Sequence, residues 1–260
     1  MKNFFQKPDN WSEMLLCDKI SYTFPLFTEA FAPYVDKLEA KKIVKEMMGD
    51  EVEVPKVIRV LADFNDFTEA DINPLHMLKC THASSRNIIF YPTVKYNVKW
   101  VLQMIDKYKK PFYTHHNEMQ YKYVEPRFFL EEKVVDYGND SQGNAVTFMF
   151  YCIGGVARTL IMMDKKLDRY RHFTVNEDTS IKQIAIENQV YHAFILPSNE
   201  TMTKMVKAAG KLSQPFEFVR VDFYLGLDEK IYFSEFTFTP HSGEQIYSDE
   251  YELELGKLWV

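Results

Sequence analysis

The sequence predicts an α+β protein with antiparallel sheets and flanking helices. Aromatic residues make up 15% of the chain while only 9 glycines occur, a balance that favours many half-buried strands. Short segments rich in aromatic and β-branched residues are joined by turn residues. Between them, apolar residues recur at helical spacing. With 260 residues, the chain can form one large domain or two closely joined lobes.

Composition and charge argue against several classes of function. The formal net charge of -6 gives no long-range positive field, so we expect no nucleic-acid partner. No apolar run is long enough for a membrane span, and the start MKNFFQKPDNW lacks the apolar core of a signal peptide, so we expect a cytoplasmic protein without membrane insertion. Cys17, Cys80 and Cys152 are far apart, which indicates neither a disulfide framework nor a thiolate zinc site.

The first of three predicted segments, 1–70, contains helical and strand elements. Asp36 is a candidate helix cap with Glu39 as its capping-box partner, and apolar residues follow at helical spacing. Gly49 is expected to end this helix.

The second segment, 71–136, begins with a strand that ends at Lys79. A loop of small residues, CTHASSR, and a second strand, NIIFY, follow. Next comes a helix whose apolar face begins at Val94 and which Pro111 stops. The strand RFFLEEKVV closes the segment.

The third segment, 137–260, opens with a polar loop and then two strands, 145–153 and 156–163. Gly154 and Gly155 between them are a strong hairpin signal. Apolar residues at helical spacing predict a helix over 199–213, with Ser198 and Asn199 as capping candidates.

A second hairpin near the C-terminus places two acids together. The segment FEFVRVDFYLGLDEKIYFSEFTF has its turn at residues 226–230, with the midpoint near Asp228-Glu229. Register counted from that midpoint pairs Asp222 with Glu235, and Arg220 with Thr237, on one face of the sheet.

Two facing carboxylates flanked by aromatic residues are unfavourable unless a cation lies between them. Mg²⁺ would fit, because it usually takes one or two carboxylates and leaves its other positions to water and substrate phosphates. Arg220 on the same face can meet the charge of a transferred phosphoryl group. The alternative is an exposed hairpin in which Arg220 simply neutralises one or both acids.

Lys79 lies at a strand end before the small-residue loop. Its ammonium group could contact phosphate oxygens, while backbone N–H groups and the hydroxyls of Thr81, Ser84 and Ser85 cradle them. The alternative is a solvated surface lysine. His115, His116 and Glu118 suggest a metal cluster only weakly, because neighbouring histidines point apart, and a surface loop is the better interpretation.

Several motifs together resemble ATP-grasp enzymes. The segments LKCTHASSRNIIF, R-x-D at 220–222 and E-x-T at 235–237 carry this resemblance. DKLEAKKIVKEMMGDEVEVP, EMQYKYVEPRFFLEE, FEFVRVDFYL and IYFSEFTFTPHSG are more closely similar to the TupA-like branch found among polysaccharide-biosynthesis proteins. The resemblance spans roughly residues 36 to 256. It implies a two-lobed ATP-grasp fold, here without a full preceding α/β domain, that uses ATP and Mg²⁺.

The resemblance also implies a role for individual residues. Lys79 would hold the α- and β-phosphates, and the loop with His82, Ser84 and Ser85 would cover the nucleotide. Glu131 and Glu132 would lie at the interlobe hinge beside the adenine. The metal ligands would be Asp222, Glu235 and Thr237, and Arg220 would contact the transferred phosphoryl group.

The implied activity is an ATP-dependent carboxylate-amine ligase acting on a surface-polysaccharide precursor through an acyl phosphate. Its acceptor would be a small molecule or a glycan. Thr147 and Met149 stand where relatives carry an acid and a lysine, and HASS replaces a glycine-rich H-G-S-G loop. The sequence therefore also allows a sugar-directed phosphoryl or glycosyl transferase, or a degenerate domain that binds nucleotide or glycan. It does not identify the oligomeric state.

Overall fold

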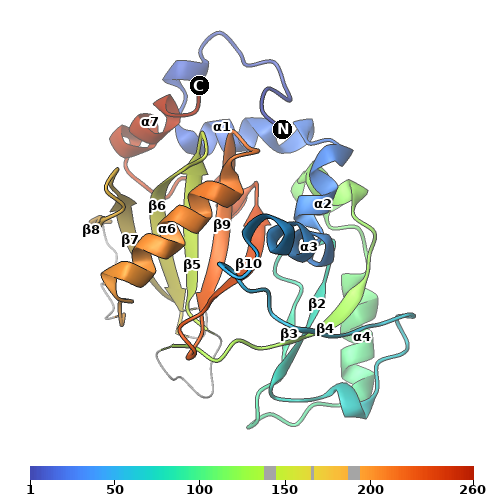
Figure 1. The fold of residues 1–260 in the computed structure, drawn as a ribbon. Coiled ribbons are helices and arrows are strands. Elements are labelled where there is room, and N and C mark those ends of the chain that lie inside the picture. Colours follow the sequence, from blue (N-terminus) through green and yellow to red (C-terminus); the bar gives the residue numbers. More distant parts are fainter. Residues whose placement is uncertain (138–144, 165–166, 187–193) are drawn as a thin grey trace.

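The computed structural model describes residues 1–137, 145–164, 167–186 and 194–260 (Figure 1). Its described strands form two sheets, in the orders β1-β4-β2-β3 and β10-β9-β5-β6-β7-β8, and their neighbours pair antiparallel. Helices flank both sheets, so the predicted α+β class is confirmed.

The smaller sheet is built from β1 (Val57–Val60), β2 (His76–Cys80), β3 (Ile88–Ile89) and β4 (Phe128–Glu132). Beside it lies α4 (Val98–Tyr108), which follows β3 in the chain (Figure 1). This helix begins after Val94, because the side chain of Asn97 accepts hydrogen bonds from the first free N–H groups and caps it there. The predicted apolar face therefore started one turn too early.

The larger sheet contains β5 (Thr147–Ile153), β6 (Val156–Asp164), β7 (Arg169–Val175), β8 (Ile181–Gln183), β9 (Phe218–Leu225) and β10 (Ile231–Thr237). The hairpin at Gly154 and Gly155 is confirmed, and both glycines have positive φ, as the tight turn requires. Every residue of β5 is buried, because β5 lies inside the sheet with helices on both sides.

Helix α6 (Asn199–Ser213) crosses one face of the larger sheet (Figure 1). It begins after its cap Ser198, as predicted, and its methionines join the main core. On the opposite face, α1 (Leu16–Thr23) and α7 (Asp249–Lys257) pack in a second apolar cluster, which includes Met149 and Tyr151 of β5. That face continues beyond the cluster into the site described below.

Helix α3 (Lys37–Met48) lies beside β10, between the two sheets in Figure 1. Asp36 caps it and Gly49 ends it, as predicted, whereas Glu39 pairs with Lys42 and Arg127. The remaining helices are α2 (Ala32–Val35) and α5 (Tyr113–His116), with short 3-10 turns, among them η5 (Met119–Tyr123).

The division at residues 70 and 136 stays a prediction. Strand β1 belongs to the first predicted segment, yet it completes the edge of the smaller sheet by pairing with β4. None of the described helices combines the length and apolar character needed to cross a membrane.

Candidate active site

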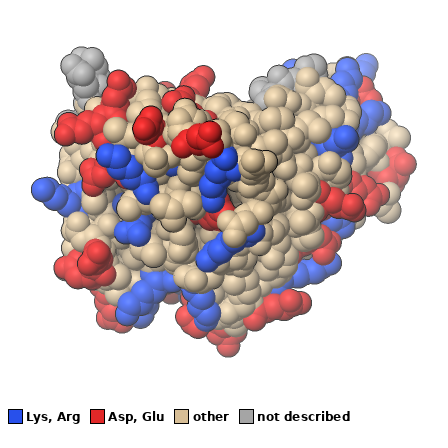
Figure 2. All heavy atoms as spheres, turned by 90° about the horizontal axis from the view of Figure 1, so that it is seen from above, with Lys and Arg blue, Asp and Glu red and all other residues tan. Residues whose placement is uncertain are grey.

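A cavity of about 670 Å³ brings side chains of both sheets together. The residues that matter for chemistry come from α3, the end of β2, the loop after it, β5, β9 and β10; they are Lys37, Lys79, Ser84, Ser85, Thr147, Met149, Arg220, Asp222, Glu235 and Thr237. On the face shown in Figure 2, acidic and basic residues are interspersed. Selectivity for a charged ligand would therefore come from the cavity itself.

The predicted pairing at the C-terminal hairpin is confirmed. Asp222 lies opposite Glu235, and Arg220 opposite Thr237. A β-bulge between Phe233 and Glu235 shifts the register by one residue, so the pairing counted from the turn midpoint holds only on the site side of the bulge.

Arg220 and Asp222 form a bidentate ion pair inside the protein. The Nε and Nη2 atoms of Arg220 donate to the two carboxylate oxygens at 2.8 and 2.6 Å, and Nη2 also donates to Oγ1 of Thr237 at 3.2 Å. Arg220 therefore neutralises an acid, as one interpretation expected, but the pair is not exposed, because Asp222 is 2% exposed. Burial raises the pKa of Asp222 to about 6 against the opposing effect of Arg220.

The acids at this hairpin fit a Mg²⁺ site. Each carboxylate oxygen has a second lone pair beyond the one that Arg220 uses, and Glu235 lines the open cavity. The described residues include no group of three or more His, Cys, Asp or Glu side chains that could hold a metal. A bound ion would thus take Asp222 and Glu235, with Thr237, water and phosphate oxygens completing its shell.

Lys79 is a buried cation rather than a solvated surface lysine. It is 4% exposed, and its Nζ lies 2.5 Å from Oε1 of Glu131. Lys41 reaches the other oxygen of the same carboxylate at 2.7 Å. Burial acts to lower the pKa of Lys79, but Glu131 outweighs it and holds that pKa above the ordinary value. Two lysines share one carboxylate, and burial lowers the pKa of Lys41, whereas Lys79 keeps its charge beside Glu131.

Lys37 is a site residue that the sequence did not reveal. Its Nζ donates to the carbonyl oxygen of Ala83 at 2.8 Å and lies 3.7 Å from Oε2 of Glu235. The only local signal is its position directly after the cap Asp36, where a side chain at the start of a helix can reach a neighbouring loop.

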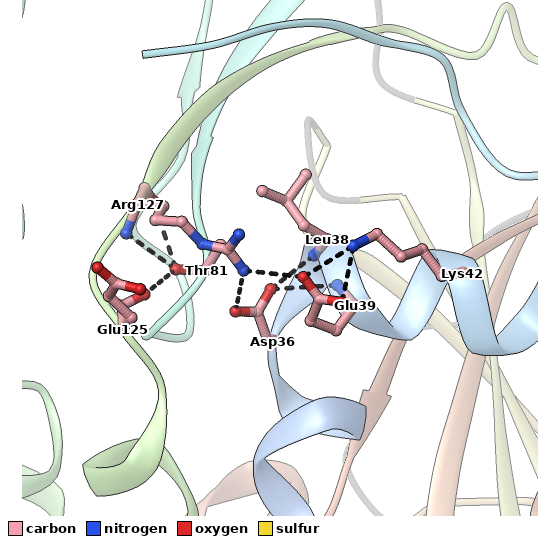
Figure 3. A network of polar contacts seen from close by, with 7 residues as sticks. All are labelled: Asp36, Leu38, Glu39, Lys42, Thr81, Glu125 and Arg127. Atoms are coloured by element: carbon pink, nitrogen blue, oxygen red, sulfur yellow. Dashed lines mark hydrogen bonds and ion pairs between the residues drawn. The ribbon is translucent and has the colours of Figure 1, made fainter. Parts of the chain in front are cut away.

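Contacts on both sides of Lys37 hold α3 against the smaller sheet. Figure 3 shows Arg127, just before β4, reaching Asp36 at 2.6 Å and Glu39 at 3.3 Å. Arg127 also donates its backbone N–H to Oγ1 of Thr81. The hydroxyl of Thr81 donates in turn to the carbonyl of Glu125, so it is engaged within the protein.

The predicted nucleotide loop divides into two parts. Ser84 and Ser85 line the cavity. His82 does not, because it is buried and its Nε2 lies 2.9 Å from the carbonyl oxygen of Tyr108. Burial lowers the pKa of His82 to about 4.

The two predicted hinge acids lie in different places. Glu131 is buried beneath Lys79 and Lys41, outside the cavity lining, while Glu132 is exposed on a neighbouring cavity of about 600 Å³. A third cavity, of about 50 Å³, adjoins the main one. It is lined by Met77, Asn87, Ile89, Lys133, Val134, Ala145, Thr147 and Tyr224. Contact of either acid with adenine stays a prediction.

Comparison with known proteins identifies the family. The family described as TupA-like ATPgrasp matches residues 27–260. No curated protein matches the chain.

Among solved structures, the D-alanine-D-alanine ligase from Helicobacter pylori is similar at 14% identity and a TM-score of 0.46, over 86% of this chain and 57% of that one. The VanG D-Ala:D-Ser ligase from Enterococcus faecalis is similar at 16% identity and a TM-score of 0.45, over 87% of this chain and 62% of that one. This chain therefore spans less than two thirds of either structure. Since the family match extends over nearly the whole sequence, the chain belongs to the TupA-like ATP-grasp family.

Proposed function

We propose that this protein is an ATP- and Mg²⁺-dependent carboxylate-amine ligase that modifies a surface-polysaccharide precursor through an acyl phosphate. Membership in an ATP-grasp family supports an enzyme of this kind. The observation that carries the proposal is the cavity in which Lys37 and Lys79 meet the paired acids Asp222 and Glu235. Cations beside an acidic pair suit a polyphosphate and its metal ion.

In the proposed reaction, the residues mainly position and neutralise charge. Lys37 and Lys79 would contact phosphate oxygens, and Arg220 the transferred phosphoryl group. Mg²⁺, held by Asp222, Glu235 and Thr237, would neutralise negative charge on the nucleotide. First, a carboxylate oxygen of the substrate takes the γ-phosphoryl group of ATP, and ADP leaves. The nitrogen of an amine then bonds to the carboxyl carbon of this acyl phosphate, phosphate departs, and the nitrogen loses a proton.

Substitution of the paired acids tests the proposal. Asp222→Asn and Glu235→Gln should each lower ADP formation, in the presence of Mg²⁺ and a panel of candidate acceptors, at least a hundredfold. Glu254→Gln, on the exposed side of α7, is the matched control and should keep full activity. Circular dichroism should show the same fold in all three variants. Normal turnover in both site variants would contradict the metal assignment.

Thr147 and Met149 motivate a second candidate, because both departures from the family pattern line the cavity and Met149 lies opposite Asp222 in the sheet. This candidate is a domain that binds nucleotide or glycan without chemistry. Calorimetry with ATP and Mg²⁺ would then show binding without hydrolysis across the acceptor panel. Product analysis separates the remaining activities: a ligase gives ADP and a new amide, a kinase gives a phosphosugar, and a glycosyltransferase needs a nucleotide sugar.

A further inference from the structure

Glu118 lies in the wall of the main cavity, close to the end of the strand that carries Glu235. It follows Asn117, whose left-handed backbone (φ 54°) ends α5. Glu118 lines the cavity although it is only 4% exposed. Its Oε2 accepts hydrogen bonds from the Thr239 hydroxyl at 2.6 Å and from the Gln120 amide at 3.2 Å. These two donors fix the carboxylate in place, so the predicted surface loop is wrong for this residue.

The charge of Glu118 has no cationic partner among the described side chains. Asp222 is paired with Arg220, and Glu235 lies 3.7 Å from Lys37. Burial raises the pKa of Glu118, the hydrogen bonds from Thr239 and Gln120 act to lower it, and the neighbouring acid Glu235 adds to the rise. A buried carboxylate is strongly destabilised in its charged form when no cation compensates it. A ligand that brings a positive charge into the cavity would remove this cost.

The amide oxygen of Gln120, in the same cluster, has no hydrogen-bond donor among the described residues. The Nε2 group of Gln120 donates to both Glu118 and Thr239, while its Oε1 is enclosed and accepts no hydrogen bond from the described residues. Acceptors therefore outnumber donors around Glu118. Glu118 lines the cavity whereas Gln120 does not, so Glu118 is the acceptor that a ligand can reach, and an ammonium group, which carries three N–H donors and no acceptor, complements it.

An organic ammonium fits this part of the cavity better than a metal ion. The cluster contributes a single carboxylate, and the described residues include no group of three metal-binding side chains. The ring of Tyr121 lines the same cavity, whereas Phe112, which also lines it, already has the guanidinium of Arg86 5.0 Å from its ring centroid. Aromatic faces attract organic cations, whereas Mg²⁺ requires oxygen ligands.

We propose that Glu118, oriented by Thr239 and Gln120, binds the protonated primary amine of the acceptor substrate and takes one proton from it, which frees the nitrogen lone pair for attack on the acyl carbon. The identification of that cation as the acceptor rests on the ligase function proposed above. The ammonium-binding property rests on the contacts of Glu118 alone.

Ligand-observed NMR on the full chain can test the subsite directly. The cationic probes are ethanolamine and L-alaninamide, and their N-acetyl derivatives are neutral probes of related shape. Wild-type protein should bind each cationic probe at least tenfold more tightly than its neutral derivative. Glu118→Gln should remove that preference, while Glu254→Gln should keep it. Equal affinity of the wild type for both probe types, or an unchanged preference in Glu118→Gln, would overturn the proposal.

Two controls separate this subsite from the proposed function. Calorimetry with a non-hydrolysable ATP analogue and Mg²⁺ should give the same affinity in Glu118→Gln and wild type. If the wild-type protein binds no nucleotide, the proposed ligase function is refuted. The preference for cationic amine probes would still test the role of Glu118. If Mg²⁺ alone lowers the affinity for the amine probes 10-fold or more, Glu118 is a metal ligand instead, and the proposal is overturned. Because the probe comparison uses wild-type protein, equal affinity for the cationic and neutral probes would overturn the proposal even if the variant does not fold.

Discussion

The role of a charged residue in this protein depends on its burial and its neighbours. Lys37 and Lys42 lie on the same helix, α3. The side chain of Lys42 is 68% exposed, whereas the side chain of Lys37 is 6% exposed and reaches the cavity. The ammonium group of Lys37 has three N–H donors. It uses one on the carbonyl oxygen of Ala83 and lies 3.7 Å from Glu235, so it retains donors for a ligand. This makes Lys37 a phosphate-binding candidate that its residue type alone would not suggest.

Lys37→Met should weaken binding of a non-hydrolysable ATP analogue with Mg²⁺ by about tenfold, or about 1.4 kcal/mol, because one buried charge is lost from the phosphate side of the cavity. Isothermal calorimetry measures the affinity. Lys42→Met is the matched control and should bind as wild type does. An unchanged affinity in Lys37→Met would mean that Lys37 serves only to hold the loop at Ala83.

At the scale of elements, α3 joins the two sheets through its first residue and its cap. Asp36 has two roles: Oδ1 caps the helix through the N–H groups of Leu38 and Glu39, and Oδ2 pairs with Arg127. These contacts position Lys37 between the loop after β2 and strand β10. Weakening the cap should therefore affect both stability and the cavity.

Two substitutions at Asp36 separate its roles. Asp36→Asn keeps a good capping oxygen but removes the charge that Arg127 contacts, whereas Asp36→Ala removes both. We expect Asp36→Ala to lower the free energy of unfolding by about 1 kcal/mol more than Asp36→Asn does, which is the usual value of a helix cap. Urea denaturation of the two variants gives this difference. Equal losses in both would show that the ion pair, not the cap, stabilises the helix start.

The sequence predicts local elements well because their signals are local. The cap Asp36, the glycines at 154 and 155, and the helix at 199–213 are each specified by residues within one or two turns of chain. The predicted Asp222–Glu235 pairing is also confirmed, but only because the bulge before Glu235 shifts the strand by the one residue by which the turn departs from the counted register.

What the sequence could not show are contacts between distant segments. His82 is buried beside a carbonyl 26 residues away, a contact that the sequence did not indicate, and its predicted contact with the nucleotide stays a prediction. Glu118 acquires its burial and its orientation from Thr239, which is 121 residues further along the chain. No pattern near residue 118 encodes that partner, so the sequence favoured a surface loop over a weakly indicated metal cluster and missed the burial of Glu118.

On the scale of the whole molecule, the two ends of the chain close one face of the larger sheet. Trp259 stacks on Phe218 with centroids 5.0 Å apart, and its carbonyl accepts a hydrogen bond from Nε1 of Trp11 at 2.7 Å. Its own Nε1 donates to Glu217 at 2.8 Å. This cluster covers the same sheet face that carries Arg220 and Asp222 further along, so it supports the cavity floor.

Trp259→Ala should lower the free energy of unfolding by about 3–5 kcal/mol, because it removes a large buried ring and one of the hydrogen-bond donors to Glu217. Chemical denaturation measures the loss. Leu258→Ala is the control, since Leu258 is 38% exposed, and it should change stability by about 0.5 kcal/mol or less. A loss below 1 kcal/mol in Trp259→Ala would mean that the chain ends contribute little to closing this face.

The bulge at Ser234 separates the C-terminal hairpin into two parts that differ in tolerance to engineering. Residues 227–230 lie on the turn side of the bulge and are exposed, so a grafted epitope or peptide tag there would lengthen the tip without altering the spacing of the acids. One residue removed at the bulge would instead rotate Glu235 to the opposite side of the strand. Anyone who inserts a reporter into this protein should therefore choose the tip and leave positions 233–237 at their native length.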